Sequence, residues 1–127
     1  MKYSLIHPII GLSLLFAIQY IRLITLRIKI INNNDNHDLI TKEELTNNNI
    51  KNLFEAPILF YMVCILMMVC NVSNSGFEIL AWTYVFLRYI HSAIHSRANR
   101  YWHRGFIFVL SMIILLIMWM YLILRIP

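Results

Sequence analysis

The sequence has few of the residues that form turns, cross-links or a charged surface. Its 127 residues include 3 glycines, 3 prolines and 2 cysteines, and only 13% of them are charged. So little glycine and proline leaves few positions for turns. Cys64 and Cys70 lie in one apolar run at a spacing that puts them on different faces of a helix. We interpret them as separate buried thiols and expect neither a disulfide nor a metal-binding pair.

Hydrophobic side chains are what the sequence has in abundance. They make up 60% of the chain, and the mean hydropathy is +0.65, whereas a soluble domain is roughly 45–50% apolar. This composition predicts an all-α integral membrane protein, a bundle of four helices with little interior of its own. Any sizeable site would then need a neighbouring subunit. The expected membrane spans are 4–24, 52–72, 77–94 and 105–124.

The basic residues indicate how the chain lies in the membrane. The net charge is +5, which in a soluble protein would suggest nucleic acid. Here the lysines and arginines flank apolar runs, so no nucleic-acid partner is expected and contact with lipid headgroups explains them. Most of them lie on one side, and the positive-inside rule therefore predicts both termini on the non-cytoplasmic side. No small-residue cleavage site follows the first run, so we expect that span to be retained.

The two links on either side of the second span differ in length. Residues 32–51 are rich in asparagine and predict a polar linker, with one short helix started by a capping box of Thr41 and Glu44. Residues 71–76 are too few for more than a tight turn, which predicts an antiparallel hairpin. Pro57 predicts a bend unless the helix begins near Glu55.

Two polar stripes lie within the apolar runs. Asn48, Asn52 and Glu55 share one helical face at the start of the second span. Counted from a turn near 73–75, Glu55 lies level with residues 93–95, and Arg88 lies about one and a half to two turns deeper. The stripe of the third span consists of Tyr84, Arg88, His91 and His95.

Glu55 and Arg88 are the costly residues of these stripes. Each would cost about 2.5–3.5 kcal/mol at the centre of a membrane helix. One interpretation is that they pair with each other and hold helices together. The other is that they bind a polar ligand. The residues alone leave both interpretations open.

Arg97, Arg100 and Arg104 follow the third span and fit two roles. They can set the topology and touch lipid phosphates. Alternatively, they surround the same polar opening at the membrane surface as Glu55 and Arg88, which we call the polar mouth. The arginines would suit the carboxylates of a small ligand there, and Glu55 would suit its ammonium group. An arginine there could also stabilise a bound thiolate, the nucleophilic form of a thiol. An apolar co-substrate could arrive from the lipid.

The histidines do not predict a metal site. His91 and His95 have the i,i+4 spacing that can chelate zinc, but no glutamate follows His91 as it does in zinc proteases. We interpret both as hydrogen-bonding groups near the membrane interface.

The stretches Asn52–Tyr61 and Leu80–Ser92, followed by His95, Asn99 and Arg104, resemble the MAPEG family, the membrane-associated proteins in eicosanoid and glutathione metabolism. The likeness is to its short bacterial members and covers essentially the whole chain. The Asn-x-x-Glu that opens the second span and the Arg-x-x-His-Ser of the third carry it. It implies a single MAPEG-like membrane domain, 1–127, assembled as a homotrimer in a bacterial inner membrane.

The resemblance also implies glutathione as a co-substrate, bound between subunits near the cytosolic face. Arg100, or less closely Arg104, matches the arginine that stabilises the glutathione thiolate in the family. The residues that match the glutathione-binding positions, or stand beside them in the motif, are Asn52, Glu55, Arg88, Tyr89 and His91.

The chain departs from the conjugating members at two positions. Asn48 stands where they have an arginine, and Ala93 stands where they have a second tyrosine. The leading interpretation is a glutathione-dependent transferase or peroxidase that acts on lipophilic substrates. The alternative is a non-enzymatic membrane protein whose polar mouth binds lipid headgroups or fixes trimer packing.

Overall fold

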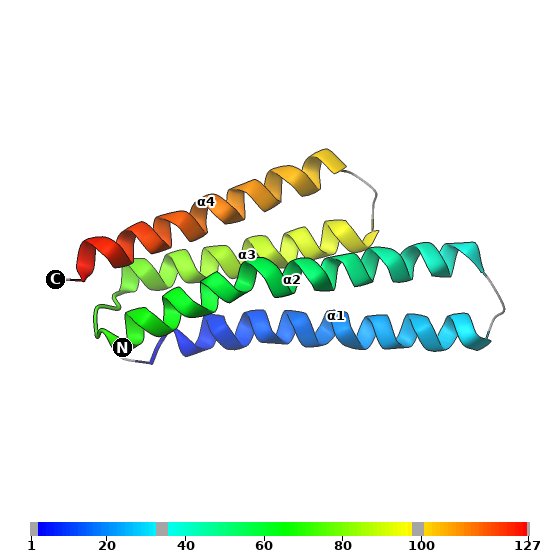
Figure 1. Cartoon of the computed structure of the whole chain (residues 1–127), viewed down its shortest axis with the longest axis horizontal. Helices are drawn as coiled ribbons and strands as arrows, with labels where there is room; N and C mark the ends of the chain where they lie inside the picture. The colour runs from blue at the N-terminus through cyan, green and yellow to red at the C-terminus, as the bar shows by residue number, and fades with distance from the viewer. Residues whose placement is uncertain (1–2, 33–35, 98–100, 127) are drawn as a thin grey trace.

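The computed structural model describes residues 3–32, 36–97 and 101–126, with the side chains of 95–97 and 101 left out of the description. Its fold is all-α, as the composition predicted. Four long helices run side by side along one axis (Figure 1). Both ends of the chain lie at one end of the bundle, which we call the termini-side end, and the opposite end is the loop-side end. The helices are α1 (Ile6–Asn32), α2 (His37–Val69), α3 (Ser75–Arg97) and α4 (Tyr101–Arg125).

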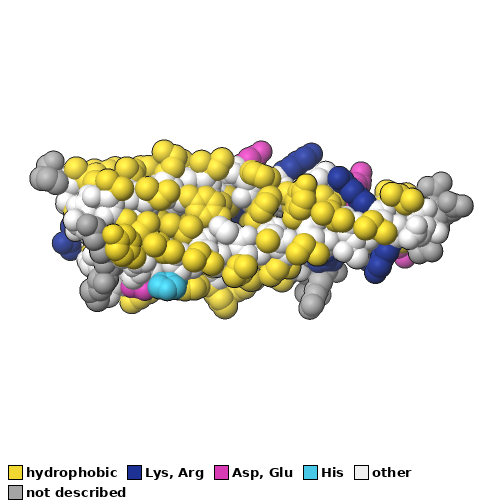
Figure 2. Space-filling model, turned by 90° about the horizontal axis from the view of Figure 1, so that it is seen from below, with side chains coloured by type: hydrophobic (Ala, Val, Ile, Leu, Met, Phe, Trp, Pro, Cys, Tyr) yellow, Lys and Arg dark blue, Asp and Glu magenta, His cyan; other side chains and the backbone are white. Residues whose placement is uncertain are grey.

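Three of these helices are long and apolar enough to cross a membrane. They are Ile6–Asn32, His37–Val69 and Trp102–Arg125. The fourth expected span, 77–94, lies in α3, which is not among them, because Glu78, Arg88 and several histidines and serines lower its hydropathy. The face of the bundle seen in Figure 2 is largely hydrophobic. Such a surface suits a bundle surrounded by lipid.

The predicted linker of residues 32–51 is largely helical, which corrects the expectation from the sequence. The Asn36 side chain accepts a hydrogen bond from the Asp38 backbone N–H at 3.1 Å and caps α2 there. Thr41 lies inside the helix and donates to the His37 carbonyl at 3.0 Å. The predicted capping box at Thr41 is therefore wrong, because the helix begins four residues earlier.

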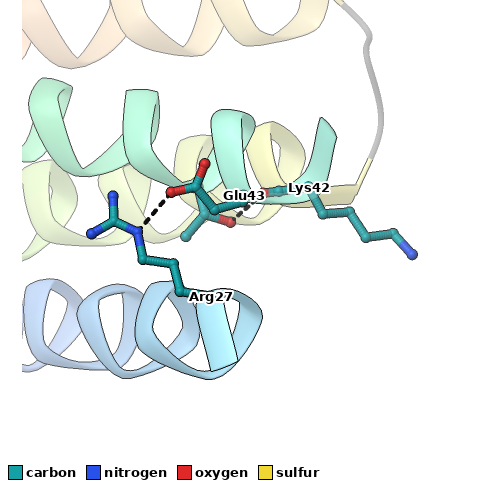
Figure 3. Close-up of polar contacts among 4 residues, drawn as sticks. Arg27, Lys42 and Glu43 are labelled. Atoms are coloured by element: carbon teal, nitrogen blue, oxygen red, sulfur yellow. Dashed lines mark hydrogen bonds and ion pairs between the residues drawn. The ribbon is translucent and has the colours of Figure 1, made fainter. Parts of the chain in front are cut away.

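The loop-side parts of α1 and α2 extend past the ends of α3 and α4 (Figure 1). The Arg27 Nε donates to a Glu43 carboxylate oxygen at 2.8 Å and joins the two helices there (Figure 3). The Arg27 side chain is 56% exposed, and exposed ion pairs of this kind contribute only about 0.2–1 kcal/mol. This ion pair therefore contributes little, and the buried residues Thr46, Asn49 and Ile50 lie further along α2, where it packs against α3.

The link between α2 and α3 is the tight turn that the sequence predicted. Asn71 has a φ of 58°, and the Val72 N–H donates to the Met67 carbonyl at 3.2 Å. This is the Schellman arrangement that ends many helices. Asn74 then caps α3, because its side-chain oxygen accepts from the Phe77 N–H at 2.9 Å. Its amide also donates to the Tyr121 hydroxyl, so the hairpin is tied to α4.

Apolar side chains fill the termini-side half of the bundle. Phe60 of α2 and Tyr84 of α3 stack at 4.6 Å between ring centroids. Pro57 lies inside α2, with its ring buried. Towards the loop-side end the interior becomes polar. The buried polar residues of that half include Thr46, Asn49, Arg88, His91 and Ser92.

Candidate functional site

Arg88 is the largest of the fully buried side chains, with 0% of its surface exposed. Its Nε donates to the Tyr84 hydroxyl at 3.1 Å. The guanidinium carbon lies 5.2 Å from the centroid of the Tyr84 ring and 5.2 Å from that of Phe108 on α4. Contact with two ring faces stabilises a desolvated cation. The two terminal nitrogens, Nη1 and Nη2, have no hydrogen-bond partner among the described residues.

His91 and Ser92 connect the same stretch of α3 to α4 and α2. The His91 Nδ1 donates to the Arg104 backbone carbonyl at 3.3 Å. Asn49 of α2 donates to the Ser92 hydroxyl at 2.6 Å, and both side chains are fully buried. These bonds lie between helices, so this polar face of α3 is used within one chain for packing.

Tyr89 faces another neighbour. Its hydroxyl donates to the Gly11 carbonyl of α1 at 2.8 Å, and about a third of the residue is exposed. A backbone carbonyl inside a helix has a second lone pair and can accept this additional bond. Tyr89 thus joins α3 to α1 and lies apart from the buried guanidinium.

Asn52 and Glu55 lie on the outside of the chain. Glu55 is exposed and Asn52 is partly buried, while the buried face of α2 carries Leu53 and Pro57. No hydrogen bond or ion pair joins Glu55 to Arg88 in the described part of the chain. The polar stripes of α2 and α3 therefore point to different sides, and Glu55 and Arg88 do not pair with each other within one chain.

The expected depths of Glu55 and Arg88 also need correction. Phe60 is level with Tyr84, and Asn49 with Ser92, so Glu55 lies level with Arg88 and not one and a half to two turns above it. The reason is that α2 ends at Val69 and α3 begins at Ser75. The hairpin is centred earlier in the sequence than assumed. Because the helices are antiparallel, a shift of its centre by one residue changes which residues are level by two.

Arg104, one of the two arginines proposed for the thiolate, is partly buried near the start of α4. The other, Arg100, lies outside the described residues, as does Asn99. The side chains of Arg97 and His95 are not described either. Among the residues that are described, no three His, Cys, Asp or Glu side chains lie close enough together to hold a metal ion.

Two members of this region were not identified from the sequence. Phe108 covers the Arg88 guanidinium, and Asn49 makes the buried bond to Ser92. Asn49 could have been found, because it precedes Leu53 by four residues and Pro57 by eight, on the face of α2 that is buried. Phe108 lies in an unbroken apolar run, where nothing in the pattern singles it out.

One protein family matches almost the entire chain. Its profile, described as the MAPEG family, matches residues 3–124. No curated protein and no solved structure matches the chain.

Proposed function

The chain belongs to the MAPEG family, and on that premise we propose that this multi-pass membrane protein binds glutathione between subunits of a homotrimer at its loop-side half. Glutathione carries carboxylates, amides, one ammonium group and a thiol. Asn52 and Glu55 would bind its amide and ammonium groups, because both side chains are accessible from outside the chain. We further propose that the loop-side end faces the cytosol, where the positive-inside rule puts it.

A single observation carries this proposal: Glu55 is not neutralised by Arg88. Its carboxylate is exposed on α2, next to the exposed apolar side chains Phe54, Ile58 and Leu59. Glu55 is fourteen residues from the termini-side end of α2 at Val69, or about 21 Å at 1.5 Å per residue. That depth lies within a hydrocarbon layer about 30 Å thick. A carboxylate there requires a polar partner from a ligand or a second subunit.

The proposed chemistry uses the glutathione sulfur. Arg104, or Arg100, would stabilise the thiolate by its positive charge. The thiolate would attack an electrophilic carbon of a lipophilic substrate and form a thioether as the leaving group departs. In the peroxidase form, two glutathione molecules would reduce one lipid hydroperoxide to the alcohol and water and become the disulfide. Tyr89 and His91 support the site by holding α3 against its neighbours.

A second candidate function is structural. It is favoured by the packing of α3, where Arg88, Tyr89, His91 and Ser92 all have contacts to other side chains or to neighbouring helices. In this alternative, Glu55 and Asn52 serve only to fix the packing of subunits. Asn48 and Ala93 stand where the conjugating members have arginine and tyrosine, which also suits a protein that has lost glutathione chemistry.

Ligand-dependent stability separates the two functions. Purified protein in detergent should gain about 4–6 °C in Tm when glutathione is present at ten times its Kd. Glu55→Gln should remove most of that gain. Glu44→Gln is the matched control, because it removes the same charge from an exposed position on the same helix. No gain in the wild type at millimolar glutathione would refute the proposal. Loss of the oligomer in Glu55→Gln, without any effect of glutathione, would support the structural role.

A further inference from the structure

Two adjoining hollows begin at the termini-side end, one on the surface of α3 and the other between α1 and α3. One has a volume of 370 Å³ and the other of 540 Å³, and Glu78 and Trp82 line both. His7, in the first turn of α1, lines the smaller hollow. In Figure 2 a histidine and an acidic side chain lie next to each other at this end, within a surface that is otherwise hydrophobic. We call the two hollows together the α1–α3 groove.

The polar end of the groove presents two hydrogen-bond acceptors. His7 Nδ1 lies 3.1 Å from the Ser4 carbonyl oxygen. A carbonyl can only accept, so Nδ1 carries the hydrogen, and Nε2 of the neutral ring is left as an acceptor. The Glu78 carboxylate is the second acceptor, and it is only partly buried. A group with several N–H donors and a positive charge is complementary to this pair.

Apart from Ser75 and Thr83, the rest of the groove is apolar, and it runs towards the middle of the bundle. Its walls include Ile10 and Leu14 from α1, which are 50% and 55% exposed, and Trp82 and Phe86 from α3, which are 44% and 65% exposed. Gly11 forms part of the floor, because a Cβ there would lie 3.4 Å from the Trp82 ring. The groove therefore combines a polar end at the tips of two helices with an apolar channel below it.

We propose that the α1–α3 groove binds a membrane phospholipid with a primary ammonium headgroup, of the phosphatidylethanolamine class. The ammonium donates to the Glu78 carboxylate and to His7 Nε2, and an acyl chain lies against Ile10, Leu14 and Phe86. Glu78 disfavours a purely anionic headgroup through like-charge repulsion. A quaternary ammonium has no N–H to donate, so phosphatidylcholine makes neither hydrogen bond. The polar end of the groove is separate from the proposed glutathione site, because Glu78 precedes Arg88, which is level with Glu55, by ten residues of α3, or about 15 Å.

Trp82 provides the reporter for a test, because it lines both hollows. Full-length protein in mixed micelles is titrated with phosphatidylethanolamine brominated on its acyl chains, and quenching of tryptophan fluorescence is followed. Brominated phosphatidylglycerol and phosphatidylcholine serve as comparisons. The ethanolamine lipid should quench at a lower mole fraction than either, and Trp82→Phe should remove that difference, leaving the signal of Trp102 and Trp119.

Substitution of the acceptors tests the polar contacts. Glu78→Gln should raise the mole fraction of ethanolamine lipid needed for half-quenching about tenfold, as expected for loss of a charge-assisted hydrogen bond. His7→Phe should raise it by a smaller factor. Glu44→Gln, at the other end of the molecule, should leave it unchanged. Equal quenching by all three lipids, or an unchanged titration in Glu78→Gln, would overturn the proposal. Absence of Trp82 quenching by every lipid would also overturn it.

Discussion

Replacement of Arg88 by methionine measures how much the aromatic enclosure of this arginine stabilises the fold. Methionine has a similar length and flexibility but has neither the charge nor the donors. The substitution removes the bond to the Tyr84 hydroxyl and both contacts with aromatic rings. It also removes the cost of enclosing a guanidinium whose Nη1 and Nη2 have no partner among the described residues.

The expected magnitude follows from these opposing terms. A hydrogen bond from a charged group contributes about 1.5–3 kcal/mol, and each desolvated cation–π contact about 0.5–2 kcal/mol. Removal of the buried charge raises the stability by about 2.5–3.5 kcal/mol, which is the cost of an arginine at the centre of a membrane helix on the insertion scale. The central values give a net loss of about 2 kcal/mol for Arg88→Met, so the variant should fold but unfold more readily.

Unfolding in mixed micelles, titrated with sodium dodecyl sulfate and followed by circular dichroism, gives this difference in free energy. Arg125→Met is the matched control. The Arg125 guanidinium lies 5.3 Å from the Tyr121 ring centroid, and the residue is exposed, so its loss should cost under about 1 kcal/mol. If Arg88→Met is as stable as the wild type or more stable, the two rings do not stabilise the buried cation.

Two further predictions concern hydrogen bonds between helices. Asn49→Ala should destabilise the bundle by about 1–3 kcal/mol because the Ser92 hydroxyl loses its partner. A double-mutant cycle with Ser92→Ala, measured by the same unfolding titration, should give a coupling energy of at least about 0.5 kcal/mol. Additive effects of the two substitutions would mean that the bond does not contribute to stability. Asn74→Ala removes both the cap of α3 and the bond to Tyr121 and should lower the free energy of unfolding by about 1–2 kcal/mol. The control, Asn32→Ala at the exposed last residue of α1, should lower it less. Equal effects of the two variants on thermal unfolding would contradict the capping role.

The all-α fold and the hairpin of α2 and α3 could be predicted from the sequence, but the start of α2 could not. Asparagine is a weak helix former, and the runs of asparagine before Asn52 resemble a linker. In the structure, Thr46, Asn49 and Ile50 are buried. Packing against neighbouring helices thus overrides the local preference, as is usual when a helix has a partner along its length. Within residues 37–51 the signal for this packing is the position of Asn49, four residues before Leu53, and it is weaker than the asparagine-rich composition.

The candidate site was predicted in part. The sequence indicated that Arg88, His91 and Tyr84 share one side of α3, and all three are buried. It did not indicate which way Asn52 and Glu55 point, because α2 is apolar on all sides beyond Glu55 and its inner face has no contrast with the outer one. The relative depth of Glu55 and Arg88 was predicted wrongly for a different reason. It depends on which residue lies at the centre of the hairpin, and a short polar turn does not determine that residue to within one position.

The continuity of α2 also affects how solutes move at the loop-side end. From His37 to Ala56 the chain has neither glycine nor proline and is helical throughout. Backbone N–H groups within a helix are engaged in its own hydrogen bonds, so this stretch cannot fold over Glu55 as a mobile lid would. A molecule that approaches the carboxylate therefore moves along a fixed helical wall. In the proposed assembly of subunits, access to Glu55 would depend on the spacing between the subunits and not on a segment that opens and closes.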